Sequence, residues 1–237
     1  MKVKLLILLS LTVLFGCNEK NDDLITSINS IPTTIGTKWT YDKQVIINEF
    51  ESVSSDKIIK RDTMNFVQTT WIEKDTIINN TTKLLVFKTI DTEYSWITYE
   101  YKEINHQGLT KYGYSYNDSA IMLSSPLLEL ALPLSIGTSW TLSLPTDGYS
   151  IQLIKTAVSA EELKIIGQNF TCYKIKWEYI NSPFNDKLKV EEWFSEQGLT
   201  KKVSSFYRIF DSIDVQSNTN DNKQVIITLT LKSINVK

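Results

Sequence analysis

Cysteine and histidine are scarce in this chain of 237 residues, which contains two cysteines and one histidine. Because Cys17 has a separate role, argued below, Cys172 would be the only free thiol, and no disulfide could form within the chain. A single histidine, His106, excludes histidine-rich zinc sites and leaves any histidine-activated nucleophile dependent on one residue. We therefore expect a fold held by its hydrophobic core, with no metal and no other cofactor.

Clustered positive charge is also missing. The 25 lysines and arginines are scattered along the chain and nearly balance the 27 aspartates and glutamates, so the formal net charge is −2. A nucleic-acid-binding surface needs a basic balance and a clustered basic face. The sequence therefore predicts no nucleic-acid partner.

Residues that could carry catalysis are few and unfavourably placed. Cys172 aligns with the apolar Leu84 in the repeat described below, which favours a quiet, partly buried thiol over a nucleophile. His106 stands beside a turn and is expected to be exposed. Glu191 and Glu192 are neighbours on a strand-like segment, so they point to opposite faces and are interpreted as solvated surface charge. With no phosphate-binding loop, nucleophile elbow or metal-ligand spacing, the sequence predicts a protein that is not an enzyme.

One apolar run stands out, and it is too short to span a bilayer. Residues 5–15 follow a basic start at residues 1–4, whereas a membrane-crossing helix needs about 20 residues. This order is typical of a signal peptide, which we assign to residues 1–16.

The run ends in Leu-Phe-Gly-Cys17, which resembles the lipobox of bacterial lipoproteins. The resemblance implies cleavage before Cys17, diacylglycerol on its sulfur and a further acyl chain, such as palmitate, on the new amino terminus. Several acyl chains, each contributing about 0.8 kcal/mol per buried methylene, would anchor the protein permanently. The alternative is an ordinary secretory signal peptide in which Cys17 has no role.

A polar segment follows the cysteine. Residues 17–30 are expected to be a disordered tether, because such a composition cannot bury enough apolar surface to offset chain entropy. Lys20 followed by Asp22 and Asp23 loosely resembles the acidic tags of surface-exposed Bacteroidota lipoproteins. We therefore expect a lipid-anchored outer-membrane protein that faces either the cell surface or the periplasm.

The chain contains an internal repeat. Residues 31–41 (IPTTIGTKWTY) return as residues 132–142 (LPLSIGTSWTL), and QGLTK occurs both at 107–111 and at 197–201. Anchors repeated in the same order indicate a duplicated unit. We predict β unit 1 at residues 31–125 and β unit 2 at residues 126–237, packed together as one body.

Both units are predicted to be built of strands. Tyr173, Ile175, Trp177 and Tyr179 alternate with polar residues, which is typical of a half-buried antiparallel strand. Only residues 127–132 could form a turn of helix. The predicted fold class is mainly β: a duplicated antiparallel sheet forming a curved half-barrel, an open barrel or a sandwich, with very little helix.

The repeated glycines and tryptophans are interpreted as structural. A glycine permits a tight bend, and a tryptophan is a large core anchor. The QGLTK element fits a hairpin turn with glycine in the left-handed region. The residues assigned to these roles are Gly36, Trp39, Gly108, Gly137, Trp140 and Gly198.

The arrangement resembles a group of uncharacterised exported β proteins of the Bacteroidota, whose pattern runs Pro-Leu-x-x-Gly-x-x-Trp-x-Tyr and ends in Gly-Leu-x-Lys. Residues 132–140 and 193–201 carry the match. The resemblance implies a curved antiparallel sheet or a partly open barrel. It supplies no catalytic residue and no function.

Aromatic residues provide the candidate ligand site. Tyr112, Tyr114 and Tyr116 alternate with smaller or polar residues and are predicted on one strand face, with Trp96 on a neighbouring strand. They could form a platform for a ligand or one wall of a core. Our leading hypothesis is a non-enzymatic carrier for an apolar or glycan ligand. The alternative is a structural component of an envelope assembly with a protein partner.

Overall fold

A computed structural model of the chain describes residues 27–52, 54–93, 96–116, 119–146, 149–180, 187–207 and 222–237. The expected signal peptide, Cys17 and most of the expected tether lie outside these residues. All regular secondary structure in these residues is β-strand, so the mainly β fold class is confirmed.

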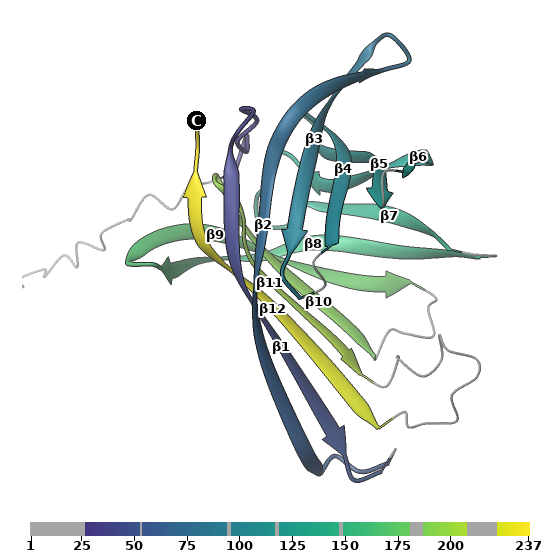
Figure 1. Ribbon diagram of the computed structural model, residues 1–237, viewed down its shortest axis with the longest axis vertical. Helices are drawn as coiled ribbons and strands as arrows, with labels where there is room; N and C mark the ends of the chain where they lie inside the picture. Colours follow the sequence, from purple (N-terminus) through teal and green to yellow (C-terminus); the bar gives the residue numbers. More distant parts are fainter. Residues whose placement is uncertain are drawn as a thin grey trace, which may run out of the picture.

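Twelve antiparallel strands of the described chain form a single sheet (Figure 1). The strands are β1 (Lys38–Phe50), β2 (Ile58–Ile78), β3 (Thr82–Asp91), β4 (Trp96–Asn105), β5 (Gly108–Tyr116), β6 (Ser119–Ala131), β7 (Ser139–Thr146), β8 (Tyr149–Ile165), β9 (Gln168–Ile180), β10 (Leu188–Ser195), β11 (Gly198–Tyr207) and β12 (Lys223–Asn235). Their order in the sheet is β6-β5-β4-β3-β2-β1-β12-β11-β10-β9-β8-β7. Each half of the chain is therefore a six-strand meander.

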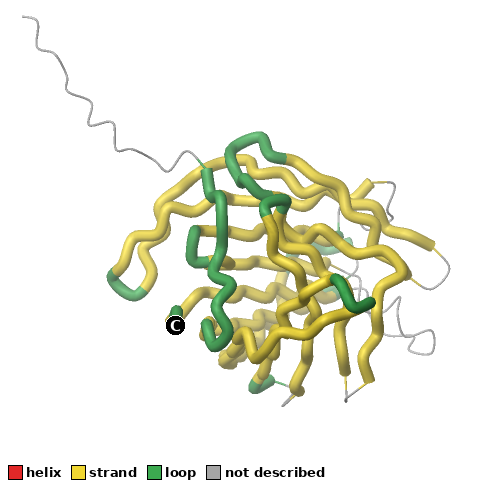
Figure 2. The backbone as a smooth tube through the Cα atoms, turned by 90° about the horizontal axis from the view of Figure 1, so that it is seen from above, coloured by secondary structure: helices red, strands yellow, loops and turns green. Residues whose placement is uncertain are grey.

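The sheet curves around a common interior and nearly closes into a barrel (Figure 2). On one side the halves are joined by a continuous ladder between β1 and β12, from the pair Lys38 and Asn235 to the pair Glu49 and Lys223. On the other side β6 and β7 are the two edges of the sheet. We call the line between β6 and β7 the seam.

The middle of the chain differs from expectation. Residues 127–132 were the one segment that could have formed a turn of helix, but residues 127–131 are the end of β6, and the expected unit boundary between residues 125 and 126 falls inside this strand. Pairing with β5 jumps from Leu127 opposite Lys111 to Met122 opposite Gly113. Pro126 lies within this irregularity, where its missing amide hydrogen costs no ladder bond. Residues 132–138 connect the two halves instead.

The two repeated Pro-x-x-x-Gly-x-x-Trp segments adopt the same turn. Gly36 has a φ of 90° and Gly137 a φ of 89°, in a region that glycine reaches without steric cost. The amide of Gly36 donates to the carbonyl of Ile72 at 2.7 Å, and the amide of Gly137 donates to that of Ala157 at 2.8 Å. Each turn therefore fastens the start of its strand to the following strand, β2 or β8.

The segment before β1 is part of the core. Ile28 is 1 % exposed and exchanges two backbone hydrogen bonds with Leu134, each of 2.8 Å. Disorder was expected to extend to residue 30. Residues 27–30 are placed instead, because the apolar Ile28 finds a buried site beside the connection between the two halves.

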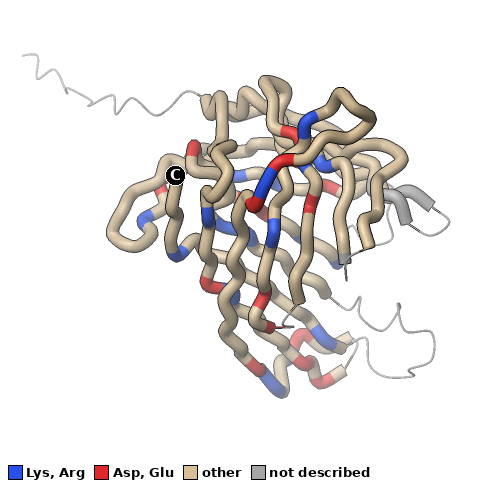
Figure 3. Tube along the Cα trace, turned by 45° about the horizontal axis from the view of Figure 1, so that its top comes forward, with Lys and Arg blue, Asp and Glu red and all other residues tan. Residues whose placement is uncertain are grey.

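The inner side of the sheet holds the core. On β9, Tyr173, Ile175 and Tyr179 are buried, whereas Lys176 and Glu178 are exposed. This confirms the half-buried strand predicted from alternation. Acidic and basic residues are interspersed along the strands of the described chain (Figure 3).

The two turn glycines Gly108 and Gly137 allow a matched test of backbone packing. Both have positive φ, but a Cβ on Gly108 would lie 1.9 Å from the carbonyl oxygen of Leu130, whereas a Cβ on Gly137 would meet nothing within 4 Å. We expect Gly137→Ala to lower the free energy of unfolding by about 1–2 kcal/mol, the cost of left-handed backbone. Gly108→Ala should lower it by more than about 4 kcal/mol. Urea unfolding measures both, and equal losses would contradict the packing of β5 on β6.

Candidate functional site

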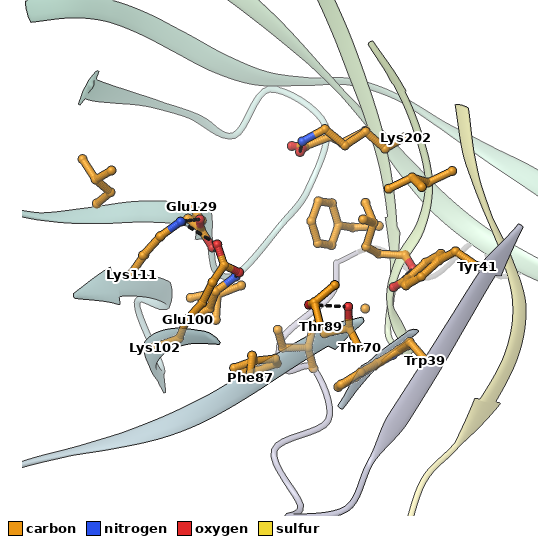
Figure 4. Close-up of a pocket in the computed structure, with 18 of the residues that line it drawn as sticks. Trp39, Tyr41, Thr70, Phe87, Thr89, Glu100, Lys102, Lys111, Glu129 and Lys202 are labelled. Atoms are coloured by element: carbon orange, nitrogen blue, oxygen red, sulfur yellow. Dashed lines mark hydrogen bonds and ion pairs between the residues drawn. The ribbon is translucent and has the colours of Figure 1, made fainter. Parts of the chain in front are cut away.

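A cavity of about 370 Å³ lies inside the curved sheet (Figure 4). All twelve strands contribute to its lining, together with Ile31 and Pro32. Small-molecule sites typically have volumes of about 300–1,000 Å³. The interior therefore has room for a small ligand and is not packed solid with side chains.

One part of the cavity wall is aromatic. Trp39 stacks on Phe87 with ring centroids 6.2 Å apart, and Tyr41 lies beside them. The Trp39 Nε1 donates to the backbone oxygen of Gln197 at 2.7 Å, and the Tyr41 hydroxyl donates to that of Leu199 at 3.1 Å. Backbone groups thus satisfy the polar tips of these side chains, which leaves their apolar surfaces to line the cavity.

A group of four charged residues lies across the cavity from Trp39 and Tyr41 (Figure 4). The Lys102 ammonium lies 2.7 Å from carboxylate oxygens of both Glu100 and Glu129, and Lys111 lies 2.5 Å from Glu100. Burial acts to raise the pKa of Glu100, but the two lysines outweigh it and lower that pKa to about 2. Burial acts to lower the pKa of Lys102, but Glu100 and Glu129 outweigh it and raise that pKa. Glu100 and Lys102 are therefore held in their charged forms.

A second charged group is centred on Glu192, and we call it the Glu192 group. One carboxylate oxygen of Glu192 accepts hydrogen bonds from Lys155 Nζ and Trp177 Nε1, both at 2.9 Å. The other oxygen accepts one from Lys202 Nζ, also at 2.9 Å. The two ammonium groups lie over the Trp177 ring, 4.2 Å from its centroid for Lys155 and 4.8 Å for Lys202. The carboxylate is thus satisfied from three strands, β8, β9 and β11.

The Glu192 group contains more positive than negative charge. Burial acts to raise the pKa of Glu192, but attraction to Lys202 and Lys155 outweighs it and lowers the pKa to about 2. For Lys155 the balance is opposite: burial lowers its pKa, and repulsion by Lys202 adds to this, against the attraction of Glu192. Two lysines share one carboxylate, and the resulting imbalance lowers the pKa of Lys155.

The interpretation of Glu192 as solvated surface charge is wrong. Glu192 is 5 % exposed and faces the cavity. The sequence contained a signal of this burial. Glu192 alternates with the apolar Val190 and Phe194 and so shares their strand face, and Lys155 shares the face of Leu153. A charged residue on the strand face that otherwise carries apolar residues lies either at the rim of the sheet or in a buried charged site.

Side chains bridge the seam in place of a backbone ladder. Trp140 Nε1 on β7 donates to the carbonyl oxygen of Leu128 on β6 at 2.9 Å. Lys155 Nζ on β8 donates to the carbonyl oxygen of Glu129, also at 2.9 Å. Lys155 therefore contacts both the cavity and the edge strand β6.

The tyrosines singled out in the sequence do not line the cavity together. A bulge on β5 sets Lys111 opposite Lys102 and Gly113 opposite Tyr101, so the expected alternation is broken. Tyr112 donates to Glu103 at 2.9 Å, on the outer face of β4, whereas Tyr114 is opposite Glu100, which lines the cavity. The prediction of one tyrosine face is therefore wrong.

The other predicted residues lie as follows. Trp96 begins β4 and is 55 % exposed, and the side chain of Tyr116 lies outside the described residues. His106 is exposed in the turn between β4 and β5. Cys172 is fully buried, and burial raises its pKa to about 11, which makes it a poor nucleophile.

The described ranges contain no group of three or more histidine, cysteine, aspartate or glutamate side chains able to hold a metal ion. They also contain no helix long and apolar enough to cross a membrane. The chemistry available in the cavity is therefore that of paired ammonium and carboxylate groups beside aromatic rings. A carboxylate with a pKa of about 2, such as Glu192, is a weak base near neutral pH.

No protein-family model matches the chain, and no curated protein matches it. A crystal structure of a predicted lipoprotein from Parabacteroides distasonis is similar with a TM-score of 0.39 and 11 % identity, covering 86 % of this chain and 97 % of that chain. A predicted exported protein with a YmcC-like fold from Bacteroides fragilis is similar with a TM-score of 0.42 and 12 % identity, covering 88 % of this chain and 99 % of that chain. Similarity this weak assigns neither a family nor a function.

Acid should weaken the fold through the buried carboxylates. Glu100 and Glu192 have their pKa lowered from 4.5 to about 2, so the unfolded chain binds more protons than the folded chain between these values. Their stabilisation is present above pH 4.5 and is lost as the pH falls towards 2. We expect urea midpoints to fall over this window, and to fall less steeply in Glu192→Gln. An unchanged slope in that variant would contradict the charged state of Glu192.

Proposed function

We propose that this protein is a non-enzymatic binding protein of the cell envelope, which holds an apolar small molecule inside its curved sheet. The observation that carries the proposal is the cavity of about 370 Å³, lined by the Trp39 and Phe87 rings and by aliphatic side chains from several strands. A protein without a ligand gains stability by filling such a space, because each cavity in a core weakens packing. A space of this size, reached by all twelve strands, is well explained by an occupant.

An apolar occupant fits the lining better than a glycan. The indole of Trp39 and the hydroxyl of Tyr41 are turned onto backbone carbonyls, so they are committed within the protein. The hydroxyls of Thr70 and Thr89 are 2.8 Å apart and bond to each other. At this part of the wall a sugar would need these polar groups for its own hydroxyls, whereas the rings and methyl groups suit the apolar part of a ligand.

The envelope location rests on the amino-terminal sequence. The lipobox-like ending at Cys17 would place the protein on a membrane, and Ile28, eleven residues further along, is bonded to Leu134 and buried. A short tether would keep the cavity near the bilayer, which is a source of apolar molecules.

Binding of N-phenyl-1-naphthylamine, an uncharged fluorescent probe, tests the proposal. We expect saturable binding with one site per chain. Thr70→Phe should weaken binding by at least about tenfold, because the new ring occupies space in the cavity. Fluorescence titration measures the affinity.

Thr69→Phe is the matched control. Thr69 is the neighbour of Thr70 on β2, and successive residues of a strand point to opposite faces, so its new ring should leave the affinity unchanged. Absence of saturable binding to the unaltered protein would overturn the proposal, especially if the protein co-purifies with a fixed protein partner, as a structural component would. Equal loss in both variants would also count against the cavity as the site.

A further inference from the structure

The charges that line the cavity do not cancel. Among the described residues, the lining contains one more lysine than glutamate: Lys102, Lys111, Lys155 and Lys202 against Glu100, Glu129 and Glu192. Around Glu100 and Glu129 the charges balance, with two lysines for two glutamates. The excess positive charge is therefore located at the Glu192 group, where Lys155 and Lys202 share one carboxylate.

Burial makes this excess costly. The side chain of Lys155 is 4 % exposed and that of Lys202 is 28 % exposed. Taking an ammonium group out of water costs several kcal/mol unless an anion compensates it. The two lysines share the Glu192 carboxylate, and Glu129 also attracts Lys155, but the pKa of Lys155 is still lowered, so the site would gain from a second negative charge.

A group with excess negative charge lies elsewhere in the described chain. A third charged group, Lys43 with Asp91 and Glu93, has one more carboxylate than ammonium, and none of its members lines the cavity. An elongated molecule with one negative end would therefore be oriented, with that end towards Lys155 and Lys202. A positive end would be repelled there.

We propose that the natural ligand is a single-chain amphiphile with an anionic head group, held by Lys155 and Lys202 beside the Trp177 ring, with its apolar part against Trp39 and Phe87. The proposal rests on the proposed function and adds the chemical class of the ligand. A carboxylate or a similar small anion can accept hydrogen bonds from both ammonium groups. The volume of about 370 Å³ lies near the lower end of the range for ligand sites, which favours one chain.

Lys155 links the proposed anion site to the seam. Its Nζ bonds both Glu192 and the carbonyl oxygen of Glu129 on β6. A ligand anion that takes the hydrogen bond now made to the Glu129 carbonyl competes with the seam contact. Ligand binding and the contact between β6 and β8 are therefore coupled through one side chain.

Competition between three amphiphiles of equal chain length tests the head-group preference. Dodecanoate, dodecan-1-ol and dodecyltrimethylammonium are each used to displace N-phenyl-1-naphthylamine. We expect dodecanoate to act at a concentration at least about tenfold lower than dodecan-1-ol, which corresponds to one charge-assisted hydrogen bond. The cation should be the weakest competitor.

Variants assign the preference to the Glu192 group. Lys202→Met leaves the pair of Lys155 and Glu192 intact and should reduce the preference for dodecanoate over dodecan-1-ol to less than about threefold. Glu192→Gln should increase it, because the site then has two ammonium groups and no carboxylate. Lys201→Met is the control, since Lys201 lies over the Trp193 ring on the outer face, and it should keep the parent preference.

The two proposals can fail separately. Equal displacement by dodecanoate and dodecan-1-ol, or stronger displacement by the cation, would overturn the anionic head group and leave the apolar cavity standing. An unaltered preference in Lys202→Met would overturn the assignment to Lys155 and Lys202. Absence of probe binding would overturn the proposed function itself.

Discussion

The ion pairs of Glu192 with Lys155 and Lys202 determine much of the interior. A buried carboxylate is tolerated only with full compensation, and here Lys155, Lys202 and Trp177 provide it from three different strands. Long lysine side chains that converge on one carboxylate cannot be replaced by apolar packing without leaving a charge uncompensated. The interior therefore keeps a buried charged group beside its hydrophobic core.

The same lysine connects the interior to the weakest line of the sheet. The two halves are joined by a continuous ladder between β1 and β12, but by Trp140 and Lys155 side chains at the seam between β6 and β7. Local opening begins where few backbone bonds must break. The seam is consequently the line along which the fewest backbone bonds hold the described sheet together.

Much of the fold could be predicted from the sequence, because it depends on local patterns. Alternation on β9 and the bends at Gly36 and Gly137 follow from strand periodicity and from the freedom of glycine. The site depends on features that local patterns do not specify. The bulge at Tyr112 turns Tyr112 and Tyr114 to different faces, and the burial of Glu192 depends on its contacts with three other strands. The one local signal of this burial was that Glu192 lies on the same strand face as Val190 and Phe194.

Mass spectrometry of the mature protein, purified from its own membranes, tests the central claim most directly, in the native state and after organic extraction. We expect one molecule of a single-chain organic acid bound per chain, and a lower occupancy of it in Lys202→Met. A clean mass of the empty protein, together with a stoichiometric protein partner, would contradict a ligand-binding cavity and identify the protein as part of an assembly.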